Sequence, residues 1–432
     1  MNISLDNDFA LRSSTSSIGR LSAFLILLVV LSLVGGESIY AQVYQVYVAA
    51  ESDDVVQRVS FDASERVAWI DTTISVGRYP AETDGPHGMT VAPDGQSWFV
   101  SIAHGNPYGY LAKYDTKTNS LQGTVDLGLF PASMEISKHT GMLYVVNFDL
   151  HGEMEPSSVM VVDPETMDLI SEFETGIMPH GTRLNTKGTK GYHVSMMSDE
   201  LIEIDTYGFE VSRILSLRNT HEAEHNMNET PDHTHSDHHA TEHNPPTIKE
   251  QLEALESTGG RMAWMNEMNQ SKPKEDTDHS QMAHHTPVIK PTWADPHPND
   301  RYVYVAGNGS DEIIEVDVEK WTLKRRIPTG KAPYNLEVSP DGRYLISALK
   351  GAGATSIIDL EQGIEIAQIP NSRKISHGVA ISPDSKFAFI SVEGIGGEAG
   401  SVDIISIENK ARVAVVETGK QAGGIAFFRM TE

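Results

Sequence analysis

The chain has 432 residues, of which 39% are hydrophobic and 22% charged, and its formal net charge is −27. This composition is that of a folded protein, and the length allows one large repeat domain or several ordinary ones. The acidic balance repels phosphate backbones, which argues against nucleic acid as a partner. The chain contains no Cys, which excludes disulfides, thiolate metal sites, iron–sulfur clusters, covalent haem and a Cys nucleophile.

The N-terminus has the layout of a secretion signal. Arg12 and Arg20 precede an apolar run, Leu21–Val34, that is shorter than the about 20 residues needed to span a bilayer. We expect cleavage after Ala41, so residues 1–41 are predicted to be a signal peptide. The sequence therefore predicts a periplasmic or secreted protein with no membrane span after cleavage. A retained N-terminal anchor is the alternative.

A short motif repeats along the rest of the chain. Its clearest copies are Pro86–Ser101, Pro333–Ser347 and Ser376–Ser391, and weaker copies start at Pro131, Pro179 and Pro291. Each copy has the pattern of a β-strand, a turn of the Pro-Asp-Gly type and a second strand. A third strand follows and ends at an aligned turn position, after which a fourth strand is expected. The seven aligned positions are Asp62, Asp115, Asp163, Asp205, Asp317, Asp359 and Ser406.

These units predict an all-β fold, a seven-bladed β-propeller with four-stranded blades of roughly 40–50 residues. Three strands are expected first, at 43–50, 55–61 and 67–76, and one unpartnered strand last, at 423–428. We expect this C-terminal strand to join the N-terminal blade and close the ring, which leaves no open-ended array and removes most of the risk of edge-to-edge pairing. An open β-solenoid is the alternative. The expected domains are blades 1–4 at 42–218, an insertion at 219–288, and blades 5–7 with the closing strand at 289–432.

The repeat resembles the bacterial YVTN-type (YncE-like) β-propeller family. The residues that carry this resemblance are Pro333–Gly342 and Tyr302–Asn308, and it extends over about residues 43–430 apart from the insertion. The resemblance implies the propeller fold. It implies no single activity, because similar propellers are binding proteins or parts of cofactor enzymes such as nitrous oxide reductase and cytochrome cd1. This chain has neither a Cys-x-x-Cys-His motif nor a Cys-bearing cupredoxin domain, which weakens a redox reading.

The insertion is rich in histidine and acidic residues, and it holds ten of the 18 His of the chain. Such tracts are typical of metal binding, and neutral imidazole suits Cu, Zn and Ni ions. We expect the insertion to be largely disordered. Its candidate ligands are His221, His225, His233, His235, His238, His239, His243, His284 and His285. The alternative is a solvated linker whose histidines bind metal only adventitiously.

Single histidines recur at corresponding places in the repeat. His87, His180 and His377 occupy one equivalent position, in Pro-His-Gly or Ser-His-Gly, while His104 and His151 lie in loops after a second strand. If the blades close into a ring, all five face one mouth of the central channel. There we expect a site for a metal ion or a small ligand, with imidazole nitrogens as ligands. The alternative for each histidine is a hydrogen bond to a neighbouring blade.

Other polar residues receive plainer interpretations. His139, His193 and His297 are read as structural or exposed, whereas Glu135, Arg183 and Glu337 are candidates to line the channel below the mouth; all are placed by the repeat pattern. The sequence has no Gly-x-Ser-x-Gly elbow and no phosphate-binding loop, so no catalytic residue is assigned.

The leading hypothesis is an exported binding protein that takes up a Cu, Zn or Ni ion through the rim histidines and the His-rich loop. One alternative is a metal- or cofactor-dependent periplasmic oxidoreductase, with a noncovalent cofactor. Another is a scaffold that binds a second exported protein, in which metal has no role.

Overall fold

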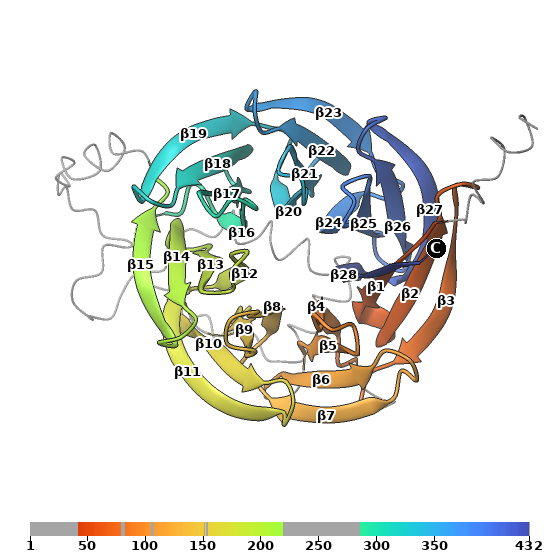
Figure 1. The fold of residues 1–432 in the computed structure, drawn as a ribbon, viewed down its shortest axis with the longest axis horizontal. Helices are drawn as coiled ribbons and strands as arrows, with labels where there is room; N and C mark the ends of the chain where they lie inside the picture. The colour runs from red at the N-terminus through yellow and green to blue at the C-terminus, as the bar shows by residue number, and fades with distance from the viewer. Residues whose placement is uncertain are drawn as a thin grey trace, which may run out of the picture. The chain divides into compact units, whose positions relative to one another are not determined.

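A computed structural model describes residues 42–78, 83–104, 108–150, 152, 154–218 and 286–431. In that part of the chain, seven antiparallel sheets of four strands each form the blades of a ring (Figure 1). The predicted all-β, seven-bladed propeller is therefore confirmed. No helix in the same part of the chain is both long and apolar enough to cross a membrane. The expected signal peptide and the histidine-rich part of the insertion lie outside the described residues.

Both ends of the described chain contribute to blade 1, in the order β28–β1–β2–β3. A short 3-10 turn, η1 (Glu51–Asp53), connects its second and third strands. The strands of this blade are β28 (Ala422–Thr431), β1 (Val43–Ala50), β2 (Val55–Asp62) and β3 (Val67–Ser75).

The other six blades follow in chain order, with each innermost strand first. Blade 2 contains β4 (Pro86–Val91), β5 (Ser97–Ile102), β6 (Tyr110–Asp115) and β7 (Leu121–Asp126); blade 3 contains β8 (Pro131–Ile136), β9 (Leu143–Asn147), β10 (Pro156–Asp163) and β11 (Asp168–Ile177); blade 4 contains β12 (Pro179–Leu184), β13 (Lys190–Ser195), β14 (Glu200–Asp205) and β15 (Glu210–Ser216). Blade 5 contains β16 (Pro291–Pro296), β17 (Tyr302–Gly307), β18 (Glu312–Asp317) and β19 (Thr322–Pro328); blade 6 contains β20 (Pro333–Val338), β21 (Tyr344–Leu349), β22 (Ala354–Asp359) and β23 (Ile364–Pro370); blade 7 contains β24 (Ile375–Ile381), β25 (Phe387–Glu393), β26 (Ala399–Ser406) and β27 (Ala411–Lys420).

The hydrophobic core lies between adjacent blades, because each sheet packs its two faces against its neighbours. Second strands such as β5 are buried along their whole length, whereas an outer strand such as β3 alternates between exposed and covered positions. Tyr47 of blade 1 stacks on Trp98 of blade 2 with ring centroids 5.1 Å apart, and Trp98 stacks on Tyr114 at 4.2 Å. The apolar runs of the repeat are thus explained by blade-to-blade packing.

The C-terminal strand closes the ring as expected. β28 pairs antiparallel with β1 from Val43↔Thr431 to Ala50↔Ala422, and Figure 1 shows it on the inner side of blade 1. Ala422 and Ile425 are buried in the core shared by blades 1 and 7. Because the chain has no disulfide, closure depends on this ladder and on the side chains packed beneath it.

The chain segments on either side of the insertion are held together by one buried carboxylate. Asp199, in the loop between β13 and β14, accepts a hydrogen bond at 2.9 Å from Nε of Arg218 and others from the backbone N–H groups of Val288, Ile289 and Lys290. Its side chain is fully buried. The residues that flank the insertion, between β15 and β16, are therefore anchored to the loop between the second and third strands of blade 4.

Removal of residues 422–432 is expected to lower the unfolding midpoint sharply or to abolish cooperative unfolding. The truncation unpairs β1 and exposes the apolar core beneath it, a loss well above the about 1 kcal/mol of a typical substitution. Thermal and urea unfolding followed by circular dichroism measure the effect, with removal of residues 431–432 alone as the control. An unchanged midpoint in the longer truncation would contradict the closure role of β28.

Asp199→Ala is expected to destabilise the protein by about 2–4 kcal/mol, because it leaves the partly buried guanidinium of Arg218 and three backbone N–H donors without their acceptor. Excision of residues 220–285 should leave the urea midpoint nearly unchanged, since Nη2 of Arg218 already contacts the carbonyl oxygen of Thr286 at 2.5 Å. Asp168→Ala, at an exposed position, is the matched control. Equal midpoints for the Asp199 and Asp168 variants would refute the anchoring role.

Candidate functional site

Three of the predicted histidines lie together where the innermost strands begin. The ring centroid of His87, from β4, is 6.4 Å from that of His180, from β12, and 5.7 Å from that of His377, from β24. All three are buried, with exposed fractions of 6%, 1% and 5%. Residues from blades 2, 4 and 7 therefore form one layer across the mouth of the channel, which we call the histidine layer.

Small residues in the neighbouring blades make room for this layer. Ala132 in β8 lies between the blades of His87 and His180, and Gly423 in β28 lies between those of His377 and His87. A Cβ atom on Gly423 would stand 2.9 Å from Oε1 of Glu51. The same Cβ atom would stand 3.7 Å from Cε1 of His377, so a larger side chain at Gly423 would crowd the layer.

The glycine after each of these histidines is required by blade packing. A Cβ atom on Gly88 would overlap the carbonyl oxygen of Ala132, one on Gly181 would overlap the Trp293 ring, and one on Gly378 would lie 2.8 Å from the carbonyl oxygen of Gly423. In each pair, the histidine side chain lies at the mouth, and the glycine allows the inner strands of adjacent blades to pack closely.

Hydrogen bonds orient two of the three imidazoles. Nδ1 of His87 lies 2.6 Å from Oε1 of Glu51 in η1. Nδ1 of His180 donates to the carbonyl oxygen of Thr292 at 2.8 Å, so its Nε2 carries a lone pair, which accepts from the Tyr334 hydroxyl at 3.1 Å. In metal sites, a histidine ligand is usually held in this way through its other ring nitrogen.

His377 completes the layer and has different partners. Its Nε2 lies 3.7 Å from Oε1 of Glu393, and its buried Nδ1 has no hydrogen-bond partner among the described residues. Glu393 also lies 3.6 Å from Nζ of Lys350, which stands 4.1 Å from the centroid of the Tyr334 ring. An ammonium and a carboxylate thus neighbour the layer on the side of blades 6 and 7.

Burial keeps two of the imidazoles neutral. It lowers the pKa of His180 to about 3, with a smaller contribution from neighbouring His87. Burial also lowers the pKa of His377 well below its ordinary value, and the charge of Lys350 acts in the same direction. At neutral pH these side chains therefore offer lone pairs rather than positive charge, as a metal ion requires.

The other predicted rim histidines differ in what can be said of them. His104 lies in the loop after β5, with Nε2 3.7 Å from Oε2 of Glu51 and its ring 5.0 Å from that of Phe130. It therefore adjoins the layer through Glu51. His151 and the candidate ligands of the insertion lie outside the described residues. Within the described ranges, no three His, Asp or Glu side chains already stand in a geometry that could hold a metal ion.

Sequence reasoning missed the two carboxylates of this site. Glu51 follows β1 and Glu393 ends β25, so both occupy the same kind of loop as His104. The repeat alignment places both acids at this shared position. Isolated acids in loops are common on protein surfaces, however, so the pattern did not indicate a site. Their burial, with side-chain exposed fractions of 3% and 13%, is a property of the assembled ring.

The three residues expected below the mouth do line a common space. Glu135, Arg183 and Glu337 lie around a cavity of about 480 Å³, and Asp295 joins them. His193 and His297 are structural, as expected, since the first contacts Oγ1 of Thr175 and the second lies 3.0 Å from the carbonyl oxygen of Gly342.

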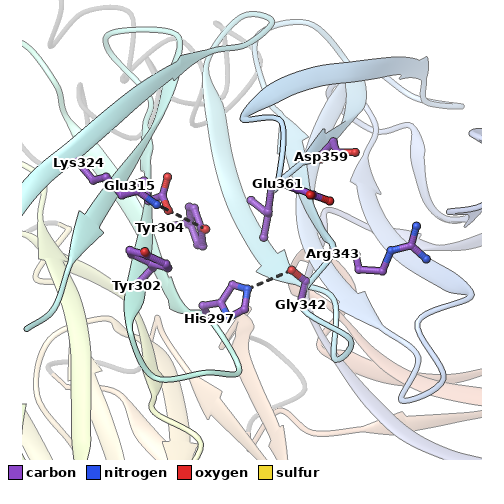
Figure 2. A pocket seen from close by; sticks show the side chains of 10 residues that line it. His297, Tyr302, Tyr304, Glu315, Lys324, Gly342, Arg343, Asp359 and Glu361 are labelled. Atoms are coloured by element: carbon purple, nitrogen blue, oxygen red, sulfur yellow. Dashed lines mark hydrogen bonds and ion pairs between the residues drawn. The ribbon is translucent and has the colours of Figure 1, made fainter.

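A second pocket, of about 320 Å³, lies between blades 5 and 6 (Figure 2). Its most buried charge is paired within the protein: Glu315 accepts from the Tyr304 hydroxyl at 3.2 Å and from Nζ of Lys324 at 2.9 Å, and it also pairs with Arg325. Arg325 in turn donates to the carbonyl oxygen of Leu360 in the next blade. This arrangement fastens two blades together, and we assign it no ligand.

No protein-family model matches the chain, and no curated protein matches it in sequence. Among solved structures, hydrazine synthase from Kuenenia stuttgartiensis is similar over 78% of this chain and 80% of that chain, with a TM-score of 0.51 and 17% identity. A functionally unknown protein from Desulfotomaculum acetoxidans is similar over 89% of this chain and 98% of that chain, with a TM-score of 0.58 and 13% identity. At these identities the similarity supports the propeller fold and no particular activity.

His180→Gln is expected to reduce the acid sensitivity of the metal-free protein. An imidazole with a lowered pKa stabilises the fold fully above its unfolded value of about 6.5, and that contribution falls as the pH drops toward the folded value. Between about pH 6.5 and pH 4.5 the wild type should lose about 2–3 kcal/mol more than the variant. Urea unfolding across this range, in the presence of a chelator, tests it. Exposed His139→Gln is the control, and identical slopes for wild type and His180→Gln would count against a neutral buried imidazole.

Proposed function

We propose that this protein is an exported propeller that binds a transition-metal ion, Cu, Zn or Ni, through His87, His180 and His377. The observation that carries the proposal is the closeness of His87 to both His180 and His377, all three buried at the channel mouth. Rings that share one tetrahedral ion, with metal–nitrogen distances of about 2.0–2.1 Å, have centroids about 5 Å apart. For the two pairs that include His87, the centroid distances of 5.7 and 6.4 Å exceed that value by about 1 Å.

The ion would enter by exchanging partners within the layer. The lone pair on Nε2 of His180 becomes available when the Tyr334 hydroxyl turns away. Glu51 holds His87 through Nδ1, which leaves Nε2 of that ring for the ion. Nearby Glu51 and Glu393 would offset part of the charge of a divalent cation, while Lys350 would oppose it.

The histidine-rich insertion is proposed as a second, weaker acceptor for the same ions. Asp199 fixes Arg218 and Val288, which flank the insertion. It lies in a loop between second and third strands, as Glu51 and His104 do. The insertion connects β15 to β16, and β16 begins at the face of the propeller where the histidine layer lies. Membership of the YVTN-type family and export to the periplasm or medium remain part of the proposal and are supported by the repeat motif and the N-terminal segment.

Untagged protein lacking residues 220–285 is expected to bind one equivalent of metal, and the full chain is expected to bind more. His377→Ala should weaken binding to the trimmed protein at least about 100-fold, and Glu51→Gln, which alters the partner and the charge beside His87, by about 10- to 100-fold. Calorimetric titration with Zn, Cu and Ni salts, together with elemental analysis, measures both effects. His139→Ala, on an exposed turn at the other end of the inner strands, is the matched control.

Different outcomes separate the competing functions. Metal bound by the full chain but not by the trimmed protein would assign binding to the insertion and remove the mouth site. No stoichiometric metal in either protein would favour a protein-interaction scaffold. A visible absorption band together with turnover of a reducible substrate would favour an oxidoreductase.

A further inference from the structure

The cavity of about 480 Å³ occupies the other half of the channel from the histidine layer. Its wall consists of the second halves of the innermost strands and of the turns that follow them. The histidines, by contrast, lie at the starts of the same strands. The volume is within the range of about 300–1,000 Å³ that small-molecule sites occupy.

Charged groups are confined to one side of this cavity. Corresponding positions of four consecutive inner strands carry Glu135 in β8, Arg183 in β12, Asp295 in β16 and Glu337 in β20. The remaining three blades contribute small or weakly polar residues at these positions, with apolar neighbours. This opposite side is formed by Met89, Thr90, Val379, Ala380, Ile425, Ala426 and Phe427.

The charged groups are held in place by bonds that leave part of each free. Glu135 accepts from the backbone N–H of Leu184 at 2.7 Å, and Asp295 accepts from that of Val338 at 2.8 Å. Each bond joins one inner strand to the next and uses one of the two carboxylate oxygens. The Arg183 guanidinium donates through Nη1 to the carbonyl oxygen of Thr182 at 2.8 Å and lies 4.8 Å from the centroid of the Trp293 ring. Further N–H donors remain on its fork.

The carboxylates are short of positive charge. Burial raises the pKa of Glu337 to about 7 and that of Asp295 well above its ordinary value, and it also raises the pKa of Glu135. Water reaches Glu135 and Glu337 from the cavity, yet protein surrounds them on the other sides and limits their solvation. Arg183 opposes all three of these pKa shifts, and Lys138 opposes only that of Glu135. A cationic group in the cavity would supply the missing charge.

We infer that this cavity binds a small zwitterion of the amino-acid type. The ligand carboxylate lies on Arg183, where bidentate hydrogen bonding is strong, and its ammonium lies among the oxygens of the neighbouring acids. An apolar ligand side chain packs against the uncharged side near Ala426 and Phe427. The site includes none of the three histidines, so the test of the metal proposal does not affect this inference.

The test compares three probes that share one apolar group. Leucine has both charges, 3-methylbutan-1-amine lacks the carboxylate, and 4-methylpentanoate lacks the ammonium. After a thermal-shift screen of the twenty free amino acids, calorimetry is expected to show leucine or another apolar amino acid binding best. Its amine and acid analogues should each bind about 10- to 100-fold more weakly, the loss of one charged hydrogen-bonded group.

Two variants distinguish the ends of the ligand. Arg183→Met should weaken binding of the amino acid but not of the amine, while Glu337→Gln should weaken the amino acid and the amine but not the acid. Exposed Glu361→Gln is the matched control for charge removal. If Arg183→Met fails to fold, the Glu337→Gln comparison still decides the matter.

The pH dependence gives an independent readout. An ammonium is favoured by ionised Glu337, so affinity should fall as the pH is lowered from about 8 to about 6, and Glu337→Gln should remove most of that change. Glu135, Lys138, Arg183 and Asp295 line the same cavity and stay unaltered in this comparison. The inference is overturned if no free amino acid shifts the melting temperature, if neither variant changes affinity, or if calcium alone binds and depends on Glu337.

Discussion

The antiparallel ladder between β1 and β28 is the constraint on which the rest of the molecule depends. It brings Val43 beside Thr431 and so turns a linear series of blades into a ring. A chain without Cys has no covalent closure, so this pairing and the buried apolar side chains around it must hold the ends. Once the ring closes, the starts of the innermost strands meet at one mouth, and residues far apart in sequence become neighbours.

Within the ring, polar contacts between inner strands fix how closely the blades approach. The glycine after each mouth histidine lies against the next blade, and carboxylates farther along the strands accept backbone N–H groups from that blade. These contacts occur at an unpaired strand edge, where buried donors would otherwise lack partners. The same residues that give the channel its chemistry therefore also contribute to its geometry.

The two halves of the channel differ in the groups that they present to a ligand. At the mouth, burial favours neutral imidazoles, with Glu51 and Glu393 beside them. Farther along, three carboxylates share a cavity with Arg183 and Lys138, and burial favours protonation of the acids. The first environment suits an ion bound through lone pairs, whereas the second suits a ligand that carries its own charges.

The sequence by itself determined the repeat, the number of blades, the strand that closes the ring and the face to which His87, His180 and His377 belong. Period-two patterning and turn residues are local, so they can be read from the chain alone. Only the tertiary structure decided that Gly423 leaves room beside Glu51 and His377, that Glu51 and Glu393 are buried beside the histidines, and that Asp295 joins the charged side of the channel. Those facts depend on distances between blades and on desolvation, which arise when separate strands are packed around one axis and have no signature within any single repeat.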